Sequence, residues 1–115
     1  MWVMTASGGF YSAIRKPDMP QDQIMVRGRR KDDLQRLLKA IGSKAEVIDT
    51  PRADYRFRVI IPTVEWARYL SEAAMGISYS NFKDASCAGD HARHEAYMDC
   101  WVALLRLQDG HYRQK

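Results

Sequence analysis

The stretch that decides the fold reads Ile24-Met-Val-Arg-Gly-Arg-Arg-Lys-Asp-Asp-Leu-Gln-Arg-Leu-Leu-Lys-Ala-Ile-Gly42. Its first six residues alternate, with Ile24 and Val26 on one face of a strand and Arg27 and Arg29 on the other. Apolar residues then recur at the spacing of an amphipathic helix, at Leu34, Leu37, Leu38 and Ile41. The stretch therefore predicts a strand that runs directly into a helix ending at Gly42.

The helix has a start signal in the same stretch. Asp32 is expected to cap its first turn, with Gln35 three residues later as the capping-box partner. The same order of strand and helix then recurs further along the chain. Tyr55-Arg-Phe-Arg-Val-Ile-Ile61 alternates, and a second helix, capped by Thr63, is expected to follow it as far as Gly76. Duplication and convergence on a common motif both account for this repeat.

A β-like segment precedes the first unit of the repeat. Alternate residues from Trp2 to Ile14 share one parity, and Ser7-Gly8-Gly9 lies in the middle of them. Two arrangements fit, either one long strand bent at the glycines or two strands joined by a tight turn. The parity continues through the glycines, so the bent strand is favoured.

The end of the chain predicts more helix. Asn81 is expected to cap one helical turn, and Asp90 to start a last helix that reaches about Gln108. The expected buried face of this last helix contains Tyr97, Cys100, Trp101, Leu104 and Leu105.

These elements predict a single α+β domain over residues 1–115. We expect a two-layer sandwich with a mainly antiparallel sheet in ββαββα order, related to the ferredoxin-like fold, plus one or two C-terminal helices. The helices would cover one face of the sheet. Ile24, Val26, Tyr55, Phe57, Val59 and Ile61 would point towards them.

Composition narrows the class of protein. The chain has 115 residues, eighteen Lys and Arg, and a net charge of +4, an excess that suits contact with nucleic acid or an acidic protein surface. Two cysteines without metal-type spacing predict reduced thiols. Neither a signal peptide nor a segment of transmembrane length is apparent. We therefore expect a cytoplasmic protein without a membrane partner or a cofactor.

The first candidate site is the sheet face opposite the helices. Arg27, Arg29, Arg56 and Arg58 are expected to point away from the helices together, and Tyr11 to join them as a stacking surface. A guanidinium presents a planar fork of donors that matches phosphate or carboxylate. The plain alternative is a solvated face whose arginines pair with Glu46 or Asp49 across strands.

The second candidate is a group of imidazoles and carboxylates on the last helix, at His91, His94, Glu95 and Asp99. Such side chains bind zinc or perform acid–base chemistry. Their order matches neither the HExxH motif nor its inversion. At 100° per residue, Glu95 and Asp99 fall on the polar side, whereas His94 leans towards the apolar face. We therefore expect no metal site here.

Several short stretches together resemble a family of small uncharacterised bacterial proteins. They are Trp2-Val-Met-Thr5, Gly9-Phe-Tyr-Ser12, Val26-Arg-Gly-Arg29, Asp54-Tyr-Arg-Phe-Arg58, Tyr79-Ser-Asn-Phe-Lys83, and the aromatic last helix with Trp101 and Leu107-Gln108. The resemblance brings no activity and no catalytic residue. It implies that Asn81, Phe82 and Lys83 shape a pocket beside the last helix, although capping by Asn81 explains part of the pattern without a ligand.

The sequence favours a small non-enzymatic cytosolic binding protein. Its partner would be an acidic macromolecule, engaged through the arginine-bearing sheet face or through an aromatic groove beside the last helix. Inhibition of a host defence complex on behalf of a mobile element is one such role. Direct nucleic-acid binding is the alternative. A metal-assisted hydrolase using His91, His94, Glu95 and Asp99 is the third hypothesis. The sequence leaves open whether two copies pair as a homodimer.

Overall fold

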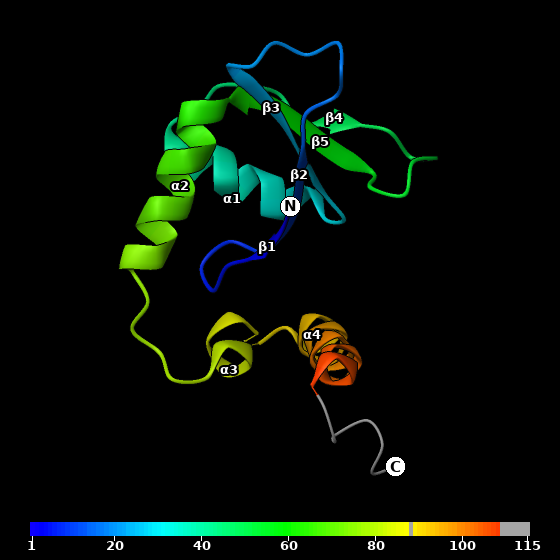
Figure 1. Ribbon diagram of the computed structural model, residues 1–115, viewed down its shortest axis with the longest axis vertical. Helices are drawn as coiled ribbons and strands as arrows, with labels where there is room; N and C mark the ends of the chain where they lie inside the picture. Colours follow the sequence, from blue (N-terminus) through cyan, green and yellow to red (C-terminus); the bar gives the residue numbers. More distant parts are fainter. Residues whose placement is uncertain (88, 109–115) are drawn as a thin grey trace. The chain divides into compact units, whose positions relative to one another are not determined.

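A computed structural model describes residues 1–87 and 89–108. The chain divides into two compact units, the first from Met1 to Ser78 and the second from Tyr79 onwards. Each unit is described by itself, and its elements are labelled in Figure 1. The expectation of a single domain stays a prediction.

The first unit is a five-stranded antiparallel sheet with two helices. Its strands are β1 (Trp2–Met4), β2 (Phe10–Ile14), β3 (Gln23–Gly28), β4 (Ile48–Asp49) and β5 (Phe57–Pro62), in the spatial order β1-β2-β3-β5-β4. Helices α1 (Lys31–Ile41) and α2 (Thr63–Met75) pack on β3 and β5, on one face of the sheet (Figure 1). The α+β class and the antiparallel sheet are confirmed. The relation to the ferredoxin-like fold stays a prediction.

The bent strand favoured for residues 1–16 is wrong, because these residues form a hairpin. Trp2 lies opposite Ser12 and Met4 opposite Phe10. The turn is closed by two hydrogen bonds, from the Thr5 amide to the Gly9 carbonyl at 3.0 Å and from the Gly8 amide to Thr5 Oγ1 at 3.1 Å. A hairpin in this register keeps the parity of its two strands, which is why parity alone could not separate the two arrangements.

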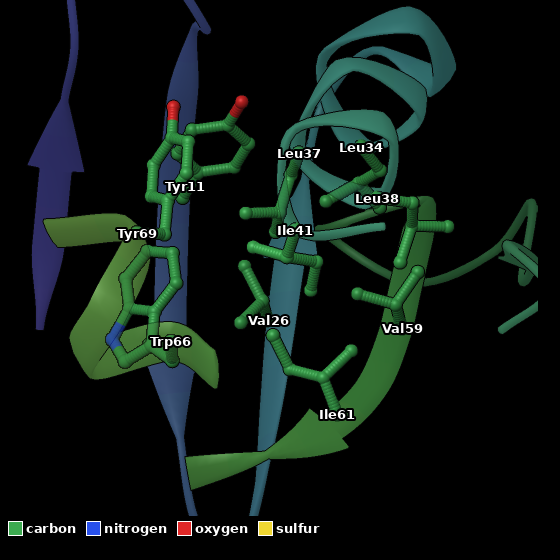
Figure 2. Packing of buried hydrophobic residues seen from close by; sticks show 11 residues of the cluster. Tyr11, Val26, Leu34, Leu37, Leu38, Ile41, Val59, Ile61, Trp66 and Tyr69 are labelled. Carbon is green, nitrogen blue, oxygen red and sulfur yellow. The ribbon is translucent and has the colours of Figure 1, made fainter. Parts of the chain in front are cut away.

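The core lies between the sheet and the two helices. Val26, Val59 and Ile61 point from the sheet towards Leu34 and Leu37 of α1 (Figure 2). All five are at most 1% exposed. Full burial of each such side chain contributes about 1.5–3 kcal/mol. The predicted apolar stripes of the repeat are thus the residues that hold the fold together.

Tyr11 belongs to this core, so its predicted place on the opposite face is wrong. Its ring packs edge-on against Trp66 at 6.0 Å and Tyr69 at 5.8 Å between centroids (Figure 2). Its hydroxyl donates to the Asp33 carbonyl at 2.8 Å. Successive residues of a strand point to opposite faces, so Tyr11 faces the helices because Ser12 faces away. Burial raises the pKa of the Tyr11 hydroxyl far above its ordinary value.

Tyr55 shows the reverse correction. It was expected to face the helices, but its ring lies on the opposite side of the sheet. The centroids of the Tyr55 and Phe10 rings are 6.3 Å apart. The reason is that β5 begins at Phe57, so the alternation of the strand does not extend back to Tyr55.

The predicted C-terminal cap of α1 is confirmed, whereas the predicted N-terminal caps of α1 and α2 are wrong. Gly42 ends α1 in the left-handed conformation with φ of 68°, as expected. However, α1 begins at Lys31 and has Arg30 at its N-cap, without a capping side chain, so Asp32 is not the cap. Thr63 is the first residue of α2 and not its cap. Its hydroxyl instead donates to the Gln21 carbonyl at 3.1 Å.

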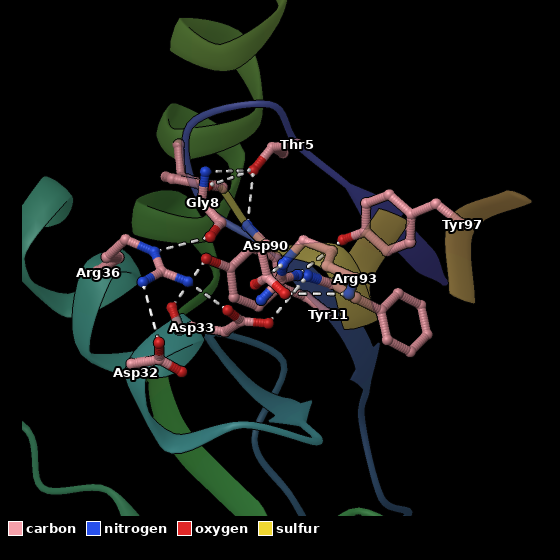
Figure 3. Close-up of polar contacts among 12 residues, drawn as sticks. Thr5, Gly8, Tyr11, Asp32, Asp33, Arg36, Asp90, Arg93 and Tyr97 are labelled. Carbon is pink, nitrogen blue, oxygen red and sulfur yellow. Dashed lines mark hydrogen bonds and ion pairs between the residues drawn. The ribbon is translucent and has the colours of Figure 1, made fainter. Parts of the chain in front are cut away.

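The first turns of α1 are joined to the β1–β2 hairpin by a set of polar contacts, which we call the bridge (Figure 3). The Asp33 carboxylate accepts a hydrogen bond from the Phe10 amide at 3.2 Å and pairs with Arg36. The Arg36 Nε group donates to the Gly8 carbonyl at 2.8 Å. A side chain at Gly9 would overlap the Asp33 carboxylate. Gly9 is therefore required by close packing against α1, whereas a side chain at Gly8 would overlap the hydroxyl groups of Tyr69, Thr5 and Tyr11.

The second unit contains α3 (Phe82–Ser86), α4 (His91–Leu104) and a 3₁₀ turn, η1 (Leu105–Leu107). Asn81 caps α3 and Asp90 caps α4 through bonds to the amides of Asp84 and Arg93, as predicted. The predicted buried face of α4 is wrong in part, because Cys100, Trp101 and Leu104 are exposed. Five residues of α3 are too few to cover a helix of fourteen.

No helix in the described ranges, 1–87 and 89–108, has the length and apolar character needed to cross a membrane.

Candidate binding site on the open sheet face

The strand register places two of the predicted arginines on the sheet face away from the helices. Arg27 of β3 lies directly opposite Arg58 of β5. Ser12 lies opposite Arg27 on the other side, and Trp2 lies opposite Ser12. Arg29 follows β3 and shares the Tyr55 ring with Arg27, and Arg56 precedes β5 and pairs with Asp49. We call the surface formed by Arg27, Arg29, Arg56, Arg58 and Tyr55 the arginine face.

The direct pairing of Arg27 with Arg58 is unfavourable by itself. Like charges at opposite positions of an antiparallel pair destabilise a sheet by about 0.2–1 kcal/mol. No carboxylate of the described residues lies within 4.0 Å of Arg27, Arg29 or Arg58. The repulsion is therefore not cancelled by an acidic side chain in the part of the chain that the structure describes.

The Tyr55 ring partly compensates for this repulsion. The guanidinium carbons of Arg27 and Arg29 lie 4.5 and 4.6 Å from its centroid. Such cation–π contacts contribute about 0.5–2 kcal/mol each, depending on desolvation. Arg58 adds a hydrogen bond from Nη2 to the Tyr55 carbonyl at 3.3 Å. One tyrosine therefore gathers three guanidinium groups on a rigid sheet.

The other guanidinium N–H groups of Arg27 and Arg58 differ in the hydrogen bonds that they make. Arg27 Nη2 donates to Ser12 Oγ at 2.6 Å. Arg58 Nη1 reaches only the sulfur of Met25, a weak acceptor, at 3.9 Å. Its Nε is buried and has no acceptor among the described residues. A buried donor left unpaired costs about 1–3 kcal/mol, so the position of the Arg58 side chain is unfavourable for folding.

Arg56 differs from the other three arginines. Its Nε donates to Asp49 Oδ1 at 2.8 Å and its Nη2 to Asp49 Oδ2 at 3.1 Å. The hydrogen bond from Arg56 holds the pKa of the Asp49 carboxyl below its ordinary value, and the same bond raises the pKa of Arg56. The plain alternative, arginines paired across strands, is therefore true of Arg56 with Asp49. Glu46 forms no such pair with any of the four.

Two aromatic residues on this face had not been predicted as part of the site. The Trp2 indole is 72% exposed, and its ring meets Phe10 edge-on at 6.0 Å. Phe10 in turn contacts Tyr55. The shared parity of Trp2, Phe10 and Ser12 was the signal that could have found them.

The predicted residues of the second unit pack against one another. Phe82 stacks on Tyr97 at 5.8 Å with 14° between the ring planes. The Lys83 ammonium lies 4.4 Å from the Trp101 ring centroid. The Asn81 side chain accepts from the Asp84 amide at 3.2 Å. These contacts between α3 and α4 explain the three residues without a ligand, and a pocket beside the last helix stays a prediction.

The residues of the proposed hydrolase do not assemble into a metal-binding group. His91 Nε2 lies 3.2 Å from Glu95 Oε1, but these side chains are 87% and 68% exposed. Within residues 1–87 and 89–108, no three His, Cys, Asp or Glu side chains are arranged to hold a metal ion. Of the predicted candidate sites, the arginine face is the one that the structure assembles.

No protein-family model, curated protein or solved structure matches the chain. Function is therefore argued from the arginine face alone.

Proposed function

We propose that this protein is a non-enzymatic binding protein that uses its arginine face to bind an acidic macromolecule in the cytoplasm. The observation that carries this proposal is the opposition of Arg27 and Arg58 without a nearby carboxylate. A sheet that only had to fold would gain by having a neutral or acidic residue at one of these positions. A bound anion would relieve the repulsion between the two guanidinium groups.

The form of the site also favours binding to an extended surface. Strands β2, β3 and β5 hold their backbones rigidly, and both helices of the first unit lie on the other face. The arginines therefore stand on a preformed platform, which lowers the entropic cost of binding. Guanidinium groups form bidentate bonds with carboxylate or phosphate, and both anions suit this arrangement.

The proposal is tested by recovering partners from the organism that encodes the protein. Tagged full-length chain is compared with the variant Arg27→Gln/Arg58→Gln and with the matched control Lys44→Gln/Arg52→Gln. The control removes the same charge at exposed residues outside the face. We expect wild type and control to retain the same partner and the arginine-face variant to lose it. Equal recovery by all three would contradict the proposal.

A further inference from the structure

We infer that the ligand of the arginine face is single-stranded nucleic acid, with Trp2 as the residue that stacks on a base. The inference rests on the proposed function and adds the chemical class of the ligand. It starts from the row that the strand register builds on the open side of the sheet. Trp2, Ser12, Arg27 and Arg58 occupy directly opposed positions on four neighbouring strands.

This row contains an aromatic side chain at one end and basic side chains at the other. At one end is an indole that is 72% exposed and meets Phe10 edge-on, so that most of its ring is open to solvent. Two strands away, at about 10 Å, is the first of the opposed arginines. Single-stranded nucleic acid offers the matching pair of groups, since its bases stack on aromatic rings and its phosphates bind guanidinium groups.

Tyr55 adds a second reason to expect bases. It holds Arg27 and Arg29 with their guanidinium carbons near its ring, and Arg29 is exposed. Guanidinium planes are themselves surfaces on which unpaired bases stack. The carboxylates of an acidic peptide would satisfy the charges of these arginines, but Asp and Glu side chains carry no ring, whereas every nucleotide carries both a charge and a ring. The aromatic residues therefore favour a nucleic acid over an acidic peptide.

The shape of the face favours single strands over a duplex. Five strands at about 4.8 Å spacing make a sheet about 19 Å wide, whereas the major groove of B-DNA is about 12 Å wide. The sheet therefore cannot enter the groove face-on. In a duplex the faces of the bases are covered by their neighbours, so that Trp2 would have nothing to stack on.

The test is fluorescence anisotropy with labelled DNA and RNA oligonucleotides of about ten nucleotides, single-stranded and as duplexes, using the full chain. We expect single strands to bind more tightly than duplexes. Trp2→Ala should weaken binding about 10-fold, as expected for the loss of one stacked base. Trp2→Tyr, which keeps a ring, should restore most of the affinity. Arg27→Gln/Arg58→Gln should lower the slope of log affinity against log salt by about 1.4.

Three outcomes would overturn the inference: no binding of oligonucleotides at low salt, equal or tighter binding of duplexes, or affinity unchanged in Trp2→Ala. The first outcome is separated from failure of the proposed function by the recovery experiment. A partner that survives nuclease treatment and still requires Arg27 and Arg58 would mean that the face binds an acidic protein. Loss of both oligonucleotide binding and arginine-dependent recovery would remove both proposals.

Discussion

At the scale of single residues, the feature that needs explaining is Arg58. Its partner across the strands is another arginine, its Nε has no acceptor among the described residues, and its Nη1 meets a sulfur. The pair Arg27–Arg58 is therefore expected to repel. A double-mutant cycle with Arg27→Gln and Arg58→Gln should give a repulsive coupling of about 0.2–1 kcal/mol in the free energy of unfolding at low salt.

The same coupling should depend on salt. The Debye length falls from about 30 Å at 0.01 M to about 8 Å at 0.15 M ionic strength, so salt screens the repulsion between exposed parts of the two side chains. Denaturant unfolding of the four proteins of the cycle at both salt concentrations measures this. An attractive coupling, or one that grows with salt, would show that the pair is not the strained feature that we describe.

The turn of the β1–β2 hairpin provides a second prediction at this scale. Gly9→Ala would place a methyl group in the Asp33 carboxylate and displace it from the Phe10 amide and Arg36. Leaving the buried Asp33 carboxylate without these donors costs about 1–3 kcal/mol, and more because the group is charged. The comparison is Gly42→Ala, which meets no atom within 4 Å but needs positive φ and should cost about 1 kcal/mol. Thermal unfolding that ranks them in the reverse order would contradict the bridge.

A third residue-scale prediction concerns Tyr11. The hydroxyl is buried and donates to the Asp33 carbonyl, and burial keeps its pKa well above the ordinary tyrosine value. Tyr11→Phe leaves that carbonyl without this donor and should destabilise the fold by about 1–3 kcal/mol. Binding through the arginine face should be unchanged, because Tyr11 points to the helices. Reduced affinity with unchanged stability would restore Tyr11 to the site and is checked by chemical denaturation beside a binding titration.

At the scale of secondary-structure elements, the short strand β4 limits the charge of the arginine face. Its Asp49 carboxylate pairs with Arg56, whereas Arg27, Arg29 and Arg58 have no carboxylate within 4.0 Å among residues 1–87 and 89–108. Asp49→Asn should release Arg56 and strengthen the binding of an anionic polymer severalfold, with the slope of log affinity against log salt steeper by about 0.7 for a single strand. Binding that is weaker in Asp49→Asn would mean that Asp49 itself contacts the ligand.

The pair of Asp49 and Arg56 makes the stability of the fold depend on pH. The pKa of Asp49 is lower in the folded chain than in the unfolded chain, mainly because Arg56 donates to it. Its contribution to stability is therefore present above the ordinary pKa of 3.8 and is lost as pH falls through the lowered value. Acid unfolding of wild type should show this loss, whereas Asp49→Asn should lack it.

The elements also show which parts of the fold the sequence could predict. The apolar stripes of α1 and the alternation of β3 and β5 are strong local signals, and they predicted both the core and the direction of Arg27 and Arg58. Tyr11, Tyr55 and Asp32 were misplaced because hairpin pairing, the exact start of β5 and the bridge to α1 are tertiary features. The parity of Trp2 with Ser12 was visible in the sequence, but the position of Trp2 directly opposite Ser12 follows only from the register of β1 with β2.

At the scale of the whole molecule, the two units divide the candidate sites. In the first unit, one sheet face packs against the helices to form the core, and the other face carries arginines and aromatic rings. In the second unit, the segment Asn81-Phe-Lys83 is accounted for by contacts between α3 and α4. The arginine face is therefore the surface whose charges and rings folding alone does not explain.

The most direct test of the arginine face is a titration of the ¹⁵N-labelled full chain with a short inorganic polyphosphate, observed at the arginine Nε–Hε signals. This probe reports each guanidinium group separately and needs no knowledge of the natural partner. We predict that the signals of Arg27, Arg29 and Arg58 shift first and together, because Tyr55 gathers these three guanidinium groups on one face of the sheet. The Arg52 signal should shift last. Equal or earlier shifts at Arg52 and Arg15 would contradict the account, because the anion would then prefer general positive charge to this face.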